Sequence, residues 1–96
     1  MTGAFDPAHQ PTPGLKTVVI YGRPGCHLCE DAVAIIERVR ARLPFTLEQR
    51  NIEADDGLFK RYLERIPVVE IDDEEAFELF VDEQQFERRL SRVDGP

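Results

Sequence analysis

Two cysteines stand three residues apart, at Cys26 and Cys29, and they are the only cysteines in the 96-residue chain. Two cysteines placed at random in such a chain would have this spacing in about 2% of cases, which argues against accident. Residues three apart on a helix are neighbours, and their Cα separation of about 5–6 Å is within the range that a disulfide accepts. We therefore expect a redox-active pair that opens and closes with little movement of the backbone.

The positions of the two cysteines predict different roles. Cys26 lies at the start of a predicted helix, where unpaired backbone N–H groups and the helix dipole favour a thiolate. We expect Cys26 to be the nucleophile. Cys29 lies one turn further on, in line with Ala32 and Ile36, so we expect it to be more buried and to resolve a mixed disulfide.

Four charged or titratable residues flank the pair. Arg23 and His27 can add positive potential near Cys26, whereas Glu30 and Asp31 oppose it, and the net effect on the thiolate stays open. A simpler interpretation applies to each of them: Arg23 and His27 as exposed side chains, and the two carboxylates as favourable residues at a helix start. Arg23 and His27 are carried forward as candidate substrate-binding residues.

A strand and a helix are predicted to hold the two cysteines. Residues 17–21 form a continuous β-branched and aromatic run that Gly22 ends, which is typical of a strand covered on both faces. From Leu28 onward apolar residues recur at helical spacing until Pro44 ends the helix. These apolar positions are Ala32, Ile35, Ile36, Val39 and Leu43. The cysteine pair then falls between the strand and the helix.

The middle of the chain predicts a second strand and a second helix. Residues 45–48 alternate as a half-buried strand that extends to Ile52, and Asp55 can cap the helix that follows. The apolar residues of that helix are Leu58, Phe59, Tyr62 and Leu63.

The remaining strands and the last helix follow from turn and cap signals. Residues 68–71 and 76–80 are predicted as an antiparallel pair joined by the acidic turn 72–75. Asp82 and Gln85 resemble a capping box at the start of the last helix. Val81 and Phe86 form the matching staple pair, and the buried face continues through Leu90 and Val93. The predicted order is β-α-β-α-β-β-α, a mixed four-stranded sheet with three helices.

The composition of the chain limits the number of domains and the kinds of partner. Residues 1–15 are rich in proline and glycine and are predicted to be a flexible tail before a single domain at 16–96. The formal charge of −7 argues against nucleic acids and anionic membranes as partners. No apolar run approaches a membrane span, and the first 15 residues do not resemble a signal peptide. We expect a cytoplasmic protein, in which a permanent structural disulfide is not expected.

Ile66-Pro67 is the second feature of interest, because a proline opens the predicted third strand. Only about 5–6% of bonds before proline are cis in folded proteins, so the base rate predicts a trans bond.

The residues 21–29, Tyr-Gly-Arg-Pro-Gly-Cys-His-Leu-Cys, together with 65–69, Arg-Ile-Pro-Val-Val, are similar to those of the glutaredoxin-like proteins of the thioredoxin superfamily. The resemblance covers about residues 16–93 and includes the order of elements. It implies a thioredoxin-like (glutaredoxin-like) fold in which Pro67 is cis and lies beside Cys26. It also implies that the backbone of Ile66 pairs with an extended substrate segment.

Two positions differ from the pattern of the glutaredoxins that use glutathione. Those proteins usually have Cys-Pro-Tyr-Cys or a monothiol variant, and a Gly-Gly pair before the last helix. Here the dipeptide is His27-Leu28, and Phe80-Val81 precedes the last helix. Asp82 and Glu83 stand where the acidic residue that contacts glutathione falls in that family, so Asp82 is a candidate substrate-binding residue. Glutathione and a thioredoxin-type reductase are both candidate electron donors.

The leading hypothesis is a monomeric cytosolic thiol-disulfide oxidoreductase with a role in cell redox homeostasis. Its substrates would be proteins or small thiols that carry a disulfide, and it would hold no permanent cofactor. A second hypothesis is a metal or iron-sulfur binding module that uses the two thiolates. A third is a redox-silent adaptor that keeps the fold and binds a protein partner.

Overall fold

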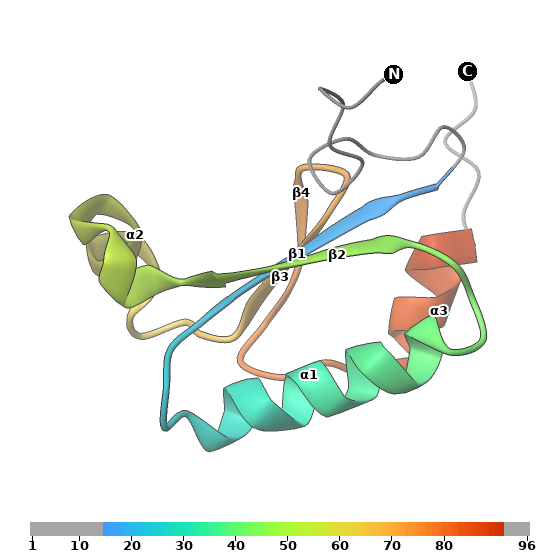
Figure 1. Cartoon of the computed structure of the whole chain (residues 1–96), viewed down its shortest axis with the longest axis horizontal. Coiled ribbons are helices and arrows are strands. Elements are labelled where there is room, and N and C mark those ends of the chain that lie inside the picture. Colours follow the sequence, from blue (N-terminus) through green and yellow to red (C-terminus); the bar gives the residue numbers. More distant parts are fainter. Residues whose placement is uncertain (1–14, 92–96) are drawn as a thin grey trace, which may run out of the picture.

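The computed structural model describes residues 15–91, so most of the predicted tail, and Val93, which was predicted to continue the buried face of the last helix, lie outside the described residues. The elements follow the predicted order, with one short 3-10 helix, η2, that was not predicted (Figure 1). They are β1 (Thr17–Gly22), α1 (His27–Arg40), β2 (Thr46–Asn51), η2 (Ile52–Ala54), α2 (Asp56–Tyr62), β3 (Val68–Ile71), β4 (Glu74–Glu78) and α3 (Glu83–Ser91).

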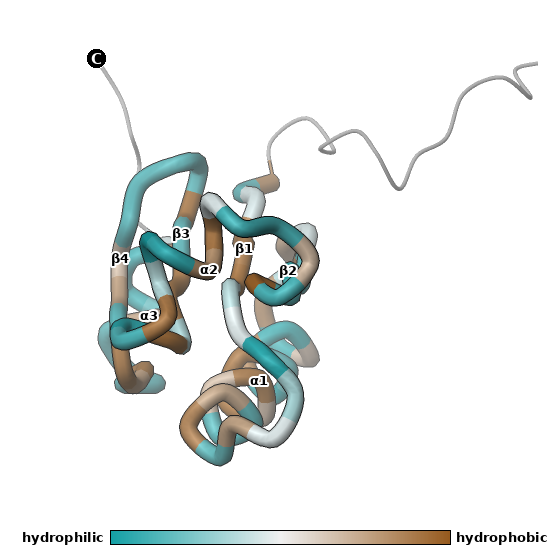
Figure 2. Tube along the Cα trace, turned by 90° about the vertical axis from the view of Figure 1, so that its left-hand side faces the viewer, coloured by the Kyte–Doolittle hydropathy of each residue, from teal (hydrophilic) through white to brown (hydrophobic). Residues whose placement is uncertain are grey.

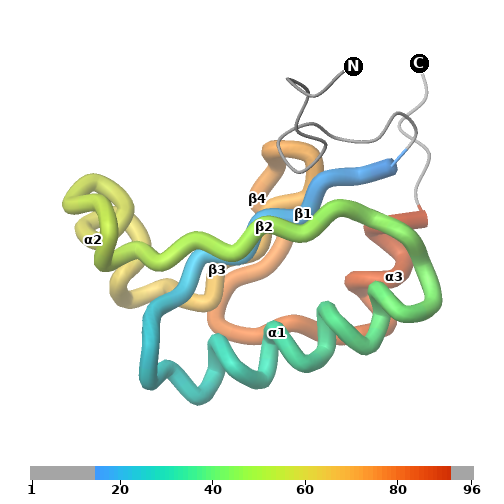
Figure 3. The backbone as a smooth tube through the Cα atoms, viewed as in Figure 1, coloured from blue at the N-terminus to red at the C-terminus, as the bar shows by residue number. Residues whose placement is uncertain are grey.

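The four strands form one mixed sheet in the order β2-β1-β3-β4, and Figure 2 shows them from β4 on the left to β2 on the right. In the view of Figure 3 the strands overlap, and β2 crosses in front of β1. β1 pairs with β2 in parallel and with β3 antiparallel, and β3 pairs with β4 antiparallel. Tyr21 is opposite Val68, and Val68 is opposite Glu78. The end of β1, the start of β3 and the end of β4 therefore meet at one end of the sheet, which we term the Gly22 end.

Helices cover both faces of the sheet, as the continuous apolar run of β1 predicts. α1 and α3 lie on one face, where alternate residues of β1 and β3 meet them in a buried cluster around Phe86 (Figure 1). Figure 2 shows apolar stretches in β1, α1 and α3, the elements that enclose this cluster. The other face packs against α2 in a second cluster that includes Val19, Tyr21, Tyr62 and Val68. Four consecutive residues of β1 are buried as a result.

The first helix is shorter than predicted. α1 ends at Arg40, whereas the apolar spacing predicts a helix that continues through Leu43 to Pro44. The backbone N–H groups of Arg42 and Leu43 both donate to the carbonyl of Val39, at 2.9 Å, and form a tight turn. The residue before a proline avoids helical backbone angles, which explains why the helix does not reach Pro44.

The fourth strand was predicted two residues too late. β4 spans Glu74–Glu78 because the turn before it uses only Asp72 and Asp73, both with positive φ. Aspartate tolerates this left-handed conformation, and two such residues suit a tight hairpin. The predicted strand residues Leu79 and Phe80 lie beyond the sheet.

The predicted helix caps are confirmed. The Asp55 carboxylate accepts a hydrogen bond from the N–H of Leu58 at 3.0 Å, at the start of α2. Asp82 accepts one from the N–H of Gln85 at 2.9 Å, at the start of α3. These caps satisfy N–H groups that a helix start otherwise leaves unpaired.

Burial also supports the predicted start of α3 but corrects β2. Val81 and Phe86 are both buried, as the staple predicts. β2 is an edge strand and is more exposed than the predicted half-buried pattern, with its last four residues open to solvent.

Within residues 15–91, no helix combines the length and the apolar character needed to cross a bilayer.

Candidate functional site

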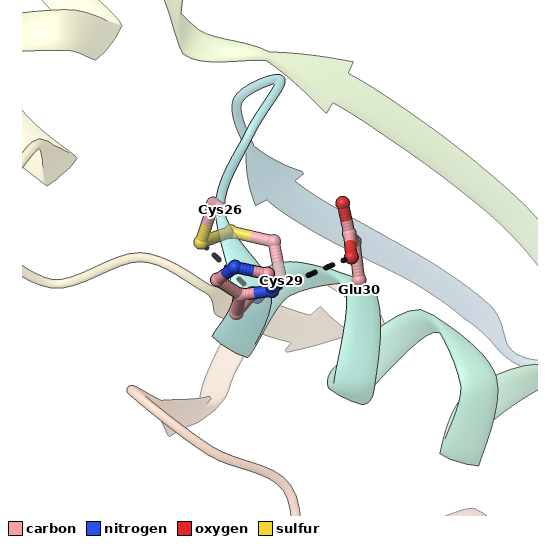
Figure 4. The surroundings of a disulfide bond; sticks show 4 residues. Cys26, Cys29 and Glu30 are labelled. Atoms are coloured by element: carbon pink, nitrogen blue, oxygen red, sulfur yellow. Dashed lines mark hydrogen bonds and ion pairs between the residues drawn. A yellow bond between two sulfur atoms is a disulfide. The ribbon is translucent and has the colours of Figure 1, made fainter.

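Cys26 and Cys29 form a disulfide at the start of α1, with their Cα atoms 5.2 Å apart (Figure 4). This separation falls in the range expected from the spacing. Because α1 begins at His27, Cys26 is the N-cap residue. The backbone N–H of Cys29 lies 3.0 Å from the Sγ atom of Cys26 and donates to it. A sulfur thus takes the place that a serine or aspartate oxygen occupies at most helix starts.

The two cysteines differ in burial. Cys29 is 6% exposed and belongs to the second core cluster, together with Tyr62 and Ile66. Cys26 is half-buried and packs against the border of the same cluster. An incoming group can therefore reach Cys26 more easily than Cys29.

Two glycines shape the loop that carries Cys26. Gly25 has a φ of +79°, a left-handed conformation that glycine adopts without a steric cost. Gly22 lies close to the second cysteine, since a Cβ atom built on it would be 3.0 Å from the Sγ and 3.2 Å from the Cβ of Cys29. The absence of a side chain at Gly22 lets Cys29 pack against the end of β1.

Arg23 is engaged by residues far along the chain. Its guanidinium lies 3.0 Å from the carboxylate of Glu53 in η2 and 5.8 Å from the centre of the Phe59 ring in α2. The positive charge expected beside Cys26 is thus balanced by a carboxylate, in a contact that the sequence did not predict.

His27 is an exposed side chain, and Glu30 and Asp31 are carboxylates at a helix start, in agreement with the simpler interpretation of these residues. The side chain of His27 is 95% exposed, and its Nδ1 atom is 3.8 Å from the carboxylate of Glu30. Glu30 and Asp31 are exposed in the first turns of α1. These carboxylates lie where a helix dipole favours negative charge.

The Ile66-Pro67 peptide bond is cis, so the prediction from the base rate was wrong and the isomer implied by the family resemblance is present. Pro67 is fully buried, and Ile66 lies in the cluster against which Cys26 packs. The carbonyl of Pro67 accepts a hydrogen bond from the N–H of Leu79 at 2.8 Å. Over residues 15–91, the peptide N–H and carbonyl of Ile66 form no hydrogen bond with protein.

The two acidic residues before and in α3 make contacts that stabilise the fold. Asp82 caps the helix. Glu83 accepts hydrogen bonds from Arg38 and Arg42 at 2.9 and 3.1 Å, and these bonds lower the pKa of Glu83. Both arginines belong to α1 or the turn after it, so Glu83 joins α3 to that helix.

A cavity of about 560 Å³ lies between α1 and the edge strand β2. Cys29 and Gly22 form part of its wall, with Val33 and Ala34 from α1 and Gln49 from β2. Sequence reasoning missed this cavity because it depends on how far the helix and the edge strand are apart.

Metal ligands do not gather around the disulfide in the part of the chain that the structure describes. Over residues 15–91, no group of three histidine, cysteine, aspartate or glutamate side chains is placed to hold one ion. A structural zinc site uses four ligands, so the donor set here does not fit one.

Comparison with known proteins places the chain in a family. Residues 17–91 match the family model described as "Glutaredoxin-like domain (DUF836)". The chain belongs to this glutaredoxin-like family. No curated protein matches the chain significantly.

Solved structures share the fold of this glutaredoxin-like protein. The solution NMR structure of protein Ne2328 from Nitrosomonas europaea is 32% identical, covers 85% of this chain and 99% of its own, and superposes with a TM-score of 0.71. The X-ray structure of protein XcR50 from X. campestris is 26% identical, covers 76% of this chain and 93% of its own, and has a TM-score of 0.64. The thioredoxin-like fold and the Cys-x-x-Cys pair are thus established for this chain.

Proposed function

We propose that this protein is a thiol-disulfide oxidoreductase of the cytoplasm. The observation that supports the proposal most directly is the hydrogen bond of 3.0 Å from the backbone N–H of Cys29 to the Sγ of Cys26. In the reduced protein, the same N–H group and the helix dipole would favour a thiolate at Cys26, and a thiolate is the nucleophile in disulfide exchange.

The reaction would take two steps. The Cys26 thiolate attacks one sulfur of the substrate disulfide, forms a mixed disulfide and releases the other sulfur as a thiolate. Cys29 then attacks the Sγ of Cys26, which closes the internal disulfide and releases the second substrate sulfur. The substrate gains two electrons and the pair loses two. The burial of Cys29 is consistent with a resolving role, because its sulfur is shielded from other disulfides.

The remaining candidates would act on substrate binding. The N–H and carbonyl of Ile66 have no hydrogen-bond partner among residues 15–91, so they are available to pair with an extended segment beside Cys26. His27 is exposed next to Cys26 and can contact a bound substrate. Arg23 would act by fixing the loop, and Asp82 by fixing the start of α3. The protein would act as a monomer, and a small thiol such as glutathione or a thioredoxin-type reductase would return it to the dithiol form.

Replacement of each cysteine tests the proposal. Pre-reduced protein is mixed with a peptide disulfide, and the released peptide thiol is followed over time. Cys26→Ser is expected to abolish release. Cys29→Ser is expected to release one thiol and to accumulate a mixed disulfide at Cys26 that mass spectrometry detects. A Cys26→Ser protein that is as active as the unmodified chain would rule out the proposal.

The redox equilibrium provides an independent measurement. The protein is equilibrated in a series of thiol and disulfide buffers that contain a metal chelator. Free thiols are then alkylated, and mass spectrometry gives the fraction of protein with the internal disulfide. We expect a reversible two-electron step in the range of roughly −180 to −270 mV that dithiol oxidoreductases span. If no internal disulfide formed in any buffer, the proposal would fail and a thiolate metal site would become the better hypothesis.

A further inference from the structure

Three large apolar side chains are exposed in the described part of the chain, and we term them the apolar rim. Leu28 is 48% exposed, Leu79 is 41% exposed and Phe80 is 69% exposed. Single exposed apolar residues are common on protein surfaces, but a group of them at one place marks an interaction site.

The sheet register brings the rim to the Gly22 end, where the disulfide lies. Val68, the first residue of β3, is opposite both Tyr21 near the end of β1 and Glu78 at the end of β4. The chain leaves β1 toward Cys26 and leaves β4 toward Leu79, so both segments emerge at the same end of the sheet. Leu28 lies between the two cysteines in sequence.

Hydrogen bonds hold Leu79 beside the proline segment. Its N–H lies 2.8 Å from the carbonyl oxygen of Pro67 and 3.1 Å from that of Arg65. The N–H of Phe80 donates to the carbonyl of Glu78 at 2.8 Å and closes a tight turn around Leu79. Leu79 has a φ of +73°, a strained conformation for a residue with a branched side chain. Such strain persists at functional sites where surrounding contacts impose it.

The segments on the two sides of the rim contribute residues to the same buried cluster. Val81, directly after Phe80, is buried in the first cluster together with Ala32 of α1. Leu28 is one helical turn before Ala32 and lies on the same side of α1, since residues four apart share a helix face. Leu28 is thus one helical turn, and Phe80 one residue, from a member of the first cluster, and both belong to segments that emerge at the Gly22 end.

We propose that the apolar rim binds apolar side chains next to the cysteine of a polypeptide disulfide, so that polypeptides rather than glutathione disulfide are the preferred substrates. This inference rests on the proposed function. The rim borders both the reactive pair, through Leu28, and the segment around Ile66, through the bonds of Leu79 to Arg65 and Pro67. Within residues 15–91 the peptide groups of Ile66 have no hydrogen-bond partner, so an extended polypeptide can pair there. Glutathione flanks its cysteine with a glutamyl and a glycyl group and has no apolar side chain to place there.

The chemistry needs no other reagent in a single turnover. The two thiols of the reduced protein supply both electrons and both sulfurs of the new internal disulfide. The bound polypeptide leaves with two thiols, and the protons come from the Cys26 and Cys29 thiols. The rim changes only how well the substrate is held while the Cys26 sulfur attacks.

The experiment compares three substrates under single-turnover conditions with pre-reduced protein. Two are peptide disulfides that differ only in having phenylalanine or serine beside each cysteine, and the third is oxidised glutathione. We expect the phenylalanine peptide to react about tenfold faster than either of the others, as burial of part of an aromatic side chain implies. The ratio of rates is the readout because it is insensitive to the redox potential of the pair.

Three variants assign the preference to the rim. Phe80→Ser and Leu28→Ser are expected to bring the ratio to within about twofold of unity. Leu79→Gly removes the side chain while favouring the left-handed backbone, so it should lower the ratio without lowering the melting temperature. Gln84→Ser changes an exposed polar residue of α3 and is expected to leave the ratio unchanged.

Binding of an unreactive peptide separates this inference from the proposed function. The phenylalanine peptide with serine in place of cysteine is titrated into the oxidised protein, and NMR shifts of the rim residues are followed. If shifts occur but no substrate is reduced, the proposed function fails and the rim is a binding surface. If peptides are reduced but Phe80→Ser keeps the ratio, or glutathione disulfide reacts as fast as the phenylalanine peptide, the rim proposal is wrong.

Discussion

Arg23 and Glu53 form an ion pair of 3.0 Å that joins the loop before Cys26 to η2. The side chains are 38% and 40% exposed, so solvent screens their attraction. The pair nevertheless connects the segment that carries the nucleophile to the second core cluster, because η2 includes the buried residue Ile52. It therefore favours one position of the loop more than it stabilises the fold.

A double-mutant cycle with Arg23→Gln and Glu53→Gln measures this contact. Exposed ion pairs contribute about 0.2–1 kcal/mol, and we expect a coupling free energy in that range from urea unfolding. The coupling should nearly vanish at about 1 M salt, where the Debye length is about 3 Å. Hydrogen exchange of the loop amides should become faster in both single variants. A coupling unaffected by salt would contradict an electrostatic contact.

Gly22→Ala tests the packing of the resolving cysteine. The new methyl group would lie 3.0 Å from the Sγ of Cys29, tighter than most Cβ contacts in proteins, so Cys29 would have to shift slightly to accept it. Overpacking of this kind costs typically about 1–3 kcal/mol. We expect a larger loss in the oxidised protein, where the disulfide prevents Cys29 from rotating away, and a shift of the redox equilibrium toward the dithiol. Thermal unfolding of both redox forms provides the measurement.

Gly25→Ala is the matched control for that variant. Nothing lies within 4 Å of a Cβ atom at Gly25, but its φ of +79° disfavours alanine. The expected cost is about 1–2 kcal/mol of backbone strain in both redox forms, with little effect on the redox equilibrium. Equal shifts of the equilibrium in the two glycine variants would show that contact with Cys29 is not the cause.

Asp82 is predicted to contribute through its cap. Asp82→Ala should lower the free energy of unfolding by about 0.5–2 kcal/mol, because the N–H of Gln85 loses its partner. Asp82→Asn keeps an acceptor and should restore most of that loss. The KM for peptide disulfides is measured with both variants. A large increase with the stable Asp82→Asn protein would assign the carboxylate a role in substrate binding as well.

The lowered pKa of Glu83 predicts that the stability of the protein changes with pH in the acidic range. Hydrogen bonds from Arg38 and then Arg42 lower its pKa from the ordinary value of 4.5 in the folded state. A carboxylate of this kind stabilises the protein above its unfolded pKa, and the contribution is lost as pH falls through the folded pKa. Glu83→Gln should therefore be less stable than the unmodified chain at pH 7, and the difference should shrink below about pH 4.5. Urea unfolding at several pH values measures it, with Glu64→Gln, an exposed carboxylate, as the control.

Sequence patterns correctly predicted the helices, strands and caps that depend on interactions between residues close together in sequence. The apolar run of β1, the helical spacing around Ala32 and Ile36, and the caps at Asp55 and Asp82 are confirmed. Each depends on residues within one or two turns of each other, so composition and spacing were sufficient. The spacing of the cysteines belongs to the same class, and their Cα separation matches the expected value.

The features that the sequence did not predict depend on contacts between distant segments. The partner of Arg23, Glu53, is 30 residues away in sequence and meets it because the parallel strands β1 and β2 end side by side. Leu79 leaves the sheet because Asp72 and Asp73 form a tighter turn than the acidic run indicated. The cis bond at Pro67 followed from the family resemblance alone, since base rates predict trans. Accordingly, the reactive pair could be identified from sequence, but not the surface that surrounds it.

The span of the disulfide has a consequence for folding. Cys26 and Cys29 are separated by three positions, so their bond closes a very short loop of the unfolded chain. Loop-closure entropy from such a bond amounts to about 2 kcal/mol, against about 4.7 kcal/mol for a loop of 100 residues. The two core clusters, rather than the bond, must then hold the chain in its native form. Opening of the bond is expected to leave a folded protein, so a substrate meets the same surface before and after each transfer of electrons.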